Sequence, residues 1–233
     1  MIEVLKTSPI GVVNYEKLIT GHYYFVDKTL LIKEFLEKNN PVTLVTRPRR
    51  FGKTINMSML AEFFDITKDS HKLFQGTKIM ETPYVSEMNQ YPVVYMTFAD
   101  AKSSKDKVVK YIKYQLKHEY ERYKHIFKNI DEHDQDDYNA IMEGIKNKRD
   151  GRLDNVDDAI VFLMEKLKAY YGKDVMVFID EYDTPFIEAH VNGFYNEVKD
   201  DLSALLGTSL KNSPCLKYAF ITGKQRTFYD SFM

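Results

Sequence analysis

The residue types best suited to chemistry stand in two short segments, each directly after an apolar run. The first segment, Arg47–Thr54, follows the run Val42–Thr46 and ends in the tripeptide Gly-Lys-Thr. This ending matches the second half of a phosphate-binding loop, whose pattern is Gly, four residues and Gly-Lys-Ser/Thr between a strand and a helix. Arg47 stands where the pattern has its first glycine. An ordinary basic turn between a strand and a helix is the alternative interpretation.

Each residue type in this loop has a physical use beside a phosphate group. Gly52 has no Cβ, so the backbone can approach a ligand closely there. A helix that starts after the loop offers free N–H groups and the positive end of its dipole. Lys53 can reach the β- and γ-phosphates, and the Thr54 hydroxyl can bind Mg²⁺. The candidate nucleotide-binding residues of the loop are Arg47, Pro48, Arg49, Arg50, Phe51, Gly52, Lys53 and Thr54.

The second segment is acidic and begins with Asp180 and Glu181, directly after the apolar run Val175–Ile179. An apolar strand that ends in Asp-Glu is typical of ATPases that carry an additional strand between their two motifs. In that arrangement the Asp belongs to the Mg²⁺ shell and the Glu polarises the attacking water. The long separation from Lys53 leaves room for intervening strands and helices. Turn and cap residues are the alternative interpretation of both acids.

Strand-like and helical patterns alternate along the chain. The strand-like runs are short and rich in β-branched and aromatic residues, and the helical patterns place apolar residues at three-to-four spacing. This order predicts an α/β fold with a mostly parallel sheet flanked by helices. We expect residues 1–40 to form an N-terminal extension packed on the core, and residues 41–233 to form a P-loop ATPase-like domain. The predicted strands are Val42–Thr46, Val93–Phe98, Val175–Asp180 and Leu216–Thr222, and the predicted helices are Asp27–Lys38, Lys53–Asp65, Lys105–Phe127, Val156–Tyr171 and Gly193–Leu210.

Composition and charge narrow the class of protein. The 233 residues are 44% hydrophobic and 29% charged, which is ordinary for a globular chain and wrong for a disordered one. Lys and Arg number 33 against 34 Asp and Glu, so no global basic field attracts nucleic acid or a membrane. The single cysteine, Cys215, excludes an intramolecular disulfide. Without a signal-peptide pattern or an apolar run of ~18 residues, we expect a cytoplasmic protein with no membrane span.

Four blocks of the sequence, taken in chain order, carry a family resemblance. They are Tyr24–Thr29, Arg47–Thr54, Phe178–Asp183 and Ile221–Gly223 with Arg226. In these blocks the chain resembles the AAA-ATPase-like family of prokaryotic P-loop proteins, whose members usually carry a PD-(D/E)xK nuclease-like domain after the ATPase. The second block is close to a signature of that family, in which arginine replaces the first glycine. Arg47 is therefore typical of the family that the chain resembles.

The resemblance implies a P-loop NTPase fold of the additional-strand ATPase type, with ATP and Mg²⁺ as cofactors. It implies that Lys53 contacts phosphate and that Thr54 and Asp180 bind the metal. Glu181 would be the catalytic acid beside the attacking water. The resemblance further implies a partner protein or nuclease-like domain on which the energy of hydrolysis acts.

Three more residues receive roles by resemblance alone. Thr222, at the end of the last predicted strand, would sense the γ-phosphate. Arg226 would contact the nucleotide or a neighbouring subunit as a second catalytic residue. Asp27 lies in the block that would sit near the nucleotide base. The chain ends at Met233, so we expect the fifth strand, the C-terminal helical lid and the nuclease-like domain of the family to be absent.

Two other functions stay open. One is a nucleotide-binding regulatory switch with little hydrolysis. The other is a nucleic-acid-associated module whose arginine-rich loop binds a polynucleotide backbone. The predicted helix Lys105–Phe127 also interleaves lysines with tyrosines, which can mark binding of single strands, although a solvated lysine face is the simpler interpretation. The acidic run 131–137 is interpreted as a solvated loop or as helix ends.

Overall fold

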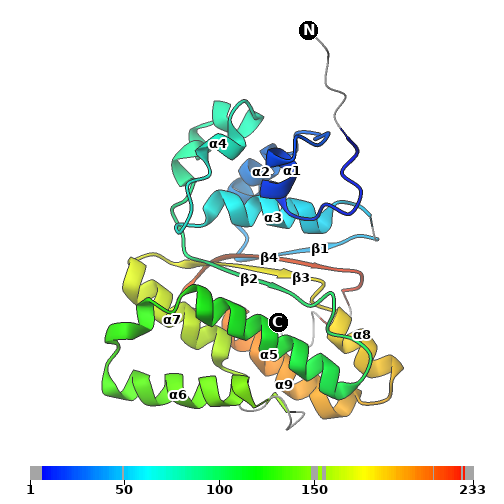
Figure 1. Cartoon of the computed structure of the whole chain (residues 1–233), viewed down its shortest axis with the longest axis vertical. Helices are drawn as coiled ribbons and strands as arrows, with labels where there is room; N and C mark the ends of the chain where they lie inside the picture. Colours follow the sequence, from blue (N-terminus) through cyan, green and yellow to red (C-terminus); the bar gives the residue numbers. More distant parts are fainter. Residues whose placement is uncertain are drawn as a thin grey trace.

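The computed structural model describes residues 7–48, 50–147, 152–153, 156–211, 213–226 and 228. In this part of the chain, four parallel strands form one sheet between two layers of helices (Figure 1). The spatial order of the strands is β1-β4-β3-β2. The predicted α/β fold with a parallel sheet is confirmed, and it is consistent with a P-loop NTPase-like arrangement. The strands are β1 (Val42–Thr46), β2 (Val93–Thr97), β3 (Val175–Asp180) and β4 (Leu216–Gly223).

The register of the sheet aligns the carboxyl ends of its strands. Thr46, the last residue of β1, lies opposite Gly223, the last residue of β4. Thr97, the last residue of β2, lies opposite Asp180, the last residue of β3. The turns that follow the four strands therefore meet at one edge of the sheet, where ligands of open parallel sheets usually bind.

Two helical layers cover the two faces of the sheet, and each encloses its own apolar cluster (Figure 1). Strand β3 serves both, since Val177 packs into one cluster and Phe178 into the other. Among the described residues, no helix is both long and apolar enough to cross a membrane. One layer holds α1 (Tyr15–Thr20), α2 (Leu30–Lys38), α3 (Lys53–Phe64), α4 (His71–Phe74), η1 (Lys78–Glu81) and η2 (Pro83–Glu87). The other holds α5 (Lys105–Arg122), η3 (Ile126–Asn129), α6 (Glu132–Lys146), α7 (Ala159–Tyr171), α8 (Thr184–Val191) and α9 (Tyr195–Leu210).

The N-terminal helices pack directly on α3. Tyr15 of α1 and Phe35 of α2 are buried in the same cluster as Phe63 and Phe64 of α3. The Tyr15 ring stacks on Phe74 at 4.8 Å, and the Phe35 ring meets Phe64 at 6.1 Å. These contacts join the described part of residues 1–40, which we propose as an extension, to the α/β domain.

Helix α5 closes the outer edge of the sheet. Strand β2 is an edge strand, and an edge strand exposes a row of unpaired N–H groups. Three of these groups donate hydrogen bonds to side chains spaced four residues apart, two of them on α5 and the third that of Tyr123, which caps the C-terminus of α5. The bonds are Val93 N to Tyr123 Oη (3.0 Å), Tyr95 N to Glu119 Oε2 (3.1 Å) and Thr97 N to Gln115 Oε1 (3.2 Å). The bonds fix the orientation of α5, whose other side is exposed.

Two charged segments form the starts of helices. The acidic run 131–137 begins α6, which agrees with its interpretation as a helix end and not as a loop, and the side chain of Asp131 accepts the N–H of Asp134 at 2.9 Å. Carboxylates are favourable there because the helix N-terminus carries partial positive charge. The segment after Asp183 starts α8, with Pro185 in its first turn, where the missing N–H of proline costs nothing.

Candidate functional site

The turn between β1 and α3 presents a lysine at the sheet edge. Gly52 adopts a left-handed backbone conformation with φ of 74° before the first residue of α3, which a residue without a Cβ reaches at little cost. The Nζ of Lys53 donates hydrogen bonds to the carbonyl oxygens of Arg47 at 2.6 Å and Pro48 at 3.0 Å. Within the described residues, no carboxylate pairs with Lys53. Its charge is therefore available to an anion.

Strand β3 ends in a carboxylate that joins this turn to the last strand. Asp180 is buried, with 2% of its surface exposed. Its Oδ2 accepts a hydrogen bond from the Thr54 hydroxyl at 2.7 Å, and its Oδ1 accepts one from the Thr222 hydroxyl. The Thr222 hydroxyl in turn accepts the N–H of Glu181 at 3.3 Å. The two segments singled out in the sequence thus meet through direct contacts.

Glu181 stands in an unusual backbone conformation directly after the strand. Its φ is 51°, a left-handed value that costs a non-glycine residue free energy and is often kept at functional sites. Its Oε2 accepts a hydrogen bond from the Thr184 hydroxyl at 3.0 Å and lies 3.4 Å from the Nζ of Lys224. Lys224 follows β4 directly and is not among the residues predicted from the sequence. The structure makes it the cation that faces Glu181.

Asp183 holds the turn after β4 against the turn after β3. Its Oδ2 accepts the backbone N–H groups of Lys224 at 2.7 Å and Gln225 at 2.8 Å. Its Oδ1 is buried without a hydrogen-bond partner in the described part of the chain. Burial raises the pKa of this carboxyl, and the two backbone N–H groups only partly offset that rise. No role was predicted for Asp183, although it is the last residue of the third block of the family resemblance.

A cavity of about 1000 Å³ opens at this edge of the sheet. Such a volume is at the upper end of the range usual for small-molecule sites. One side is apolar and belongs to the N-terminal segment, whereas the other carries the charged groups of the strand ends. The walls are Pro9, Ile10, Gly11, Val12, Val13, Tyr15, Leu18, Tyr24, Phe25, Val26, Lys28, Arg50, Gly52, Lys53, Thr54, Ile55, Asn56, Met59, Ala99, Asp100, Lys102 and Glu181.

The candidate residues divide by their place relative to this cavity. Those that line it are Arg50, Gly52, Lys53, Thr54 and Glu181. Asp180 and Thr222 are buried directly behind that wall. Arg47, Pro48, Phe51 and Arg226 are exposed and are not among its lining residues. Arg49 lies outside the described residues.

Asp27 shapes the N-terminal wall through its hydrogen bonds. Its Oδ1 accepts the N–H and the hydroxyl of Thr29 at 2.9 and 2.7 Å, and its Oδ2 accepts the N–H of Lys78 at 2.9 Å. Partial burial would raise the pKa of Asp27, but these hydrogen bonds outweigh it and hold the pKa below its ordinary value. The neighbours Val26 and Lys28 line the cavity, whereas Asp27 does not. Its role near a nucleotide base stays a prediction.

The oxygen atoms of Thr54 and Asp180 fit a hard divalent cation. In the described part of the chain, no three residues among His, Cys, Asp and Glu gather into a metal-binding group. Mg²⁺ does not need such a group, because it is commonly held by one or two carboxylates together with waters and substrate phosphates. The hydroxyl and carboxylate, 2.7 Å apart, supply the protein's share of such a set.

Comparisons with known proteins point to one family. A family model described as "Predicted AAA-ATPase" matches residues 9–232. A protein of Azotobacter chroococcum mcd 1, described as "Uncharacterized protein in vnfD 5'region", is 25% identical over 226 residues. The match covers 94% of this chain but only 37% of that relative. No solved structure matches the chain. The family description supports ATP binding as a general function.

Proposed function

The chain belongs to the family of predicted AAA-ATPases, and from that premise we propose that it binds ATP with Mg²⁺ and hydrolyses the γ-phosphate. One observation carries the proposal. Lys53 and Thr54 from the β1 turn and Glu181 from the β3 turn line the same cavity of about 1000 Å³. A phosphate loop that faces an acidic strand end supplies the positioning and charge that phosphoryl transfer requires.

Lys53 would bind the phosphates by exchanging its present partners. Its ammonium donates to two loop carbonyls, and a phosphate oxygen is a stronger acceptor because the hydrogen bond is then charge-assisted at both ends. No ion pair has to break first. The first N–H groups of α3 would add further donors, since they have no partner within the helix.

Thr54 and Asp180 would hold Mg²⁺, which when bound neutralises charge on the phosphate oxygens. The hydrogen bond between the two side chains would give way to the metal. Thr222 would keep its hydrogen bond to the other oxygen of Asp180 and so orient the carboxylate. We propose that Thr222 senses the γ-phosphate through this contact and through the N–H of Glu181.

Glu181 would orient the attacking water and accept its proton, which is the work of a general base. Thr184 and Lys224 both contact its Oε2, so the carboxylate is held before substrate arrives. Arg226 is proposed to contact the nucleotide or a neighbouring subunit. Coupling of hydrolysis to a partner protein or nuclease-like domain, in the cytoplasm, belongs to the same proposal and rests on the family.

The apolar wall of the cavity would receive the base and sugar. Tyr24 and Val26 are both more than half exposed and face the cavity from the N-terminal segment. Covering these surfaces with a flat purine would remove apolar area from water. Asp27 would act here by fixing the backbone of the wall through its hydrogen bonds to Thr29 and Lys78.

The test is a calorimetric titration of ATP into the protein with and without Mg²⁺, with phosphate release followed in parallel. We expect Mg²⁺-dependent binding together with release. Binding without release would favour the regulatory switch over the ATPase. Absence of binding would contradict the whole proposal. The control for substitutions in the loop is Lys72→Ala, because it removes an exposed lysine of α4.

A further inference from the structure

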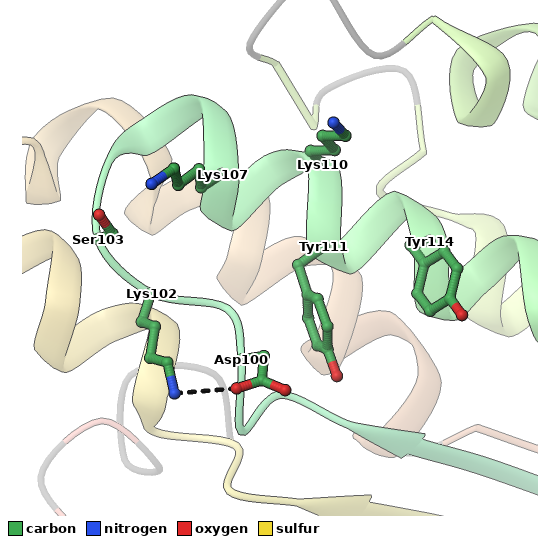
Figure 2. Close-up of a pocket in the computed structure, with 7 residues that line it drawn as sticks. All are labelled: Asp100, Lys102, Ser103, Lys107, Lys110, Tyr111 and Tyr114. Carbon is green, nitrogen blue, oxygen red and sulfur yellow. Dashed lines mark ion pairs between the residues drawn. The ribbon is translucent and has the colours of Figure 1, made fainter.

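A second hollow, of about 540 Å³, lies beside the nucleotide cavity. It is formed by the loop after β2 and the first half of α5 (Figure 2). Asp100 and Lys102 belong to both hollows, and the other walls belong to this one alone. We call it the α5 groove, lined by Asp100, Lys102, Ser103, Lys107, Lys110, Tyr111 and Tyr114.

The aromatic wall of the α5 groove is partly open to solvent, because Tyr114 is exposed whereas Tyr111 is half-buried against the core. Tyr111 and Tyr114 are one helical turn apart, and both extend from the same side of α5 (Figure 2). Their ring centroids are 6.1 Å apart with an interplanar angle of 35°. Tyr114 is 44% exposed, whereas Tyr120 and Tyr123 on the same helix are buried. The tyrosines of α5 thus divide into a core pair and a pair that faces the groove.

The α5 groove carries two lysines without an ion pair in the described part of the chain, close to two acids outside its lining, Asp106 and Glu188, the second of which accepts the N–H of Ser103 at 2.9 Å. Lys107 and Lys110 are exposed and form no ion pair with any described residue. Lys102 pairs with Asp100, the only acid of the lining, at 2.9 Å. Of the acids outside the lining, Glu197 pairs with Lys105 at 2.9 Å. The net charge of the chain is −1, so this positive surface is local.

We propose that the α5 groove binds single-stranded nucleic acid, with bases against Tyr111 and Tyr114 and phosphates at Lys107 and Lys110. Sequence-tolerant binding of single strands combines aromatic faces for stacking with cations that follow the backbone. A duplex would not use the rings, because its bases already stack on one another. An acidic peptide would use the lysines and leave the aromatic faces uncovered.

The first experiment measures binding of a labelled oligothymidylate by fluorescence anisotropy at several salt concentrations. We expect wild-type protein to bind, with a log K that falls linearly as log salt rises. The double variant Lys107→Gln/Lys110→Gln should lower the steepness of that line by about 1.4, at about 0.7 for each lost phosphate contact with a single strand.

Two lysines in the opposite helical layer provide a matched control for that double variant. Lys38→Gln/Lys72→Gln removes the same charge from exposed positions on the far side of the sheet (Figure 1). We expect it to leave the slope unchanged. No binding by wild-type protein, or the same change of slope in both double variants, would overturn the proposal.

The second experiment isolates the aromatic contribution. Tyr114→Ala should weaken oligothymidylate binding about tenfold, since stacking of one base on one ring is worth about that factor, and it should leave the salt slope unaltered. Tyr114→Phe keeps the ring and should bind like wild type. Tyr170→Ala removes a 58% exposed tyrosine of α7 and is the control. Equal losses in Tyr114→Phe and Tyr114→Ala would overturn the stacking contact.

Competition experiments identify the class of ligand that the α5 groove binds. Unlabelled oligothymidylate should displace the probe, whereas equal charge concentrations of polyglutamate, a DNA duplex or free thymidine monophosphate should not. Equal displacement by any of these three would overturn the proposal. The inference does not rest on ATP hydrolysis, so Lys53→Ala should still bind the oligomer. Loss of oligomer binding in Lys53→Ala would place the strand in the phosphate loop and overturn the groove.

Discussion

The cavity at the strand ends and the α5 groove are neighbours that share Asp100 and Lys102, yet they are built in different ways. The cavity takes its walls from the N-terminal segment, the β1 turn, the loop after β2 and the β3 turn. The groove takes all of its lining from residues 100–114. The cavity therefore depends on segments far apart in the sequence, whereas the groove depends on one helix and the loop before it.

The two sites also hold their charged groups differently. In the cavity, Lys53 is bonded to loop carbonyls, and Glu181 contacts Thr184 and Lys224. In the groove, Lys107 and Lys110 are exposed and have no ion-pair partner among the described residues. Groups held in place favour binding that depends on geometry, whereas exposed lysines favour binding that depends on salt. The variants below test whether the two sites differ in this way.

The largest effect is expected from Glu181→Gln. The amide cannot accept a proton from water but can still accept the Thr184 hydrogen bond, so phosphate release should fall about 10²- to 10⁴-fold. ATP binding, followed by calorimetry, should change little, and oligothymidylate binding should not change. Glu165→Gln, at an exposed position of α7, is the matched control. Full turnover by Glu181→Gln would remove the assigned role.

Lys53→Ala should give the next largest effect. Loss of a buried charge-assisted contact typically costs about 2–5 kcal/mol, so the Kd for ATP should rise at least about thirtyfold. Lys72→Ala should leave that Kd unchanged. Unaltered ATP affinity in Lys53→Ala would contradict the assignment of the phosphate loop.

A smaller effect, on stability, is expected from Asp183. Asp183→Ala leaves the N–H groups of Lys224 and Gln225 without their acceptor, which should lower the free energy of unfolding by about 2–3 kcal/mol. Asp183→Asn keeps an oxygen that can accept both and should lose less. Urea unfolding of the three proteins measures the difference. Equal stability of Asp183→Ala and wild type would show that the two turns do not need this carboxylate.

The same residue predicts a pH dependence. The pKa of Asp183 is raised by burial above its ordinary value of 3.8, so the protonated carboxyl is favoured in the folded state. The resulting stability is fully present below the unfolded pKa and is lost as pH rises through the raised folded pKa. The stability of wild type relative to Asp183→Asn should therefore fall with rising pH. If the stability of wild type relative to Asp183→Asn instead increased with rising pH, the argument that burial raises the pKa of Asp183 would be contradicted.

The sequence predicted the elements whose signals are local. The apolar run before Asp180 and the Gly-Lys-Thr turn after β1 each identify a strand end by composition alone. Lys224 and Asp183 carried no such signal, because their importance arises only when β4 is inserted between β1 and β3. The N-terminal wall of the cavity could not be predicted from the sequence for the same reason. The family resemblance indicated its block, Tyr24–Thr29, but not which side chains face the cavity.

In α5, the periodicity of the sequence could not distinguish buried tyrosines from exposed ones. Tyr114 and Tyr120 lie on the same amphipathic helix, yet one is 44% exposed and the other 1%. The difference comes from contacts distant in sequence, since the hydroxyl of Tyr120 donates to the carbonyl of Ala159 on α7 at 2.8 Å. A lysine face alone would have favoured a solvated surface. The hollow beside Tyr111 and Tyr114 forms only when the chain is folded.

The smallest effects should come from Asp100, which both hollows share. Its ion pair with Lys102 is exposed, with 64% and 54% of the two side chains accessible, so breaking it should change the free energy of unfolding by less than about 1 kcal/mol. Asp100→Asn removes the acid of the groove and frees Lys102 for a phosphate. The affinity for oligothymidylate should rise by less than about fivefold, and the salt slope should become steeper by up to about 0.7. ATP affinity should change less than oligothymidylate affinity, because the proposed phosphate and metal contacts are made by Lys53, Thr54 and Asp180, which the two hollows do not share. A parallel change in ATP affinity would mean that the two hollows act as one site, and the contrast between a fold-built cavity and a local groove would no longer hold.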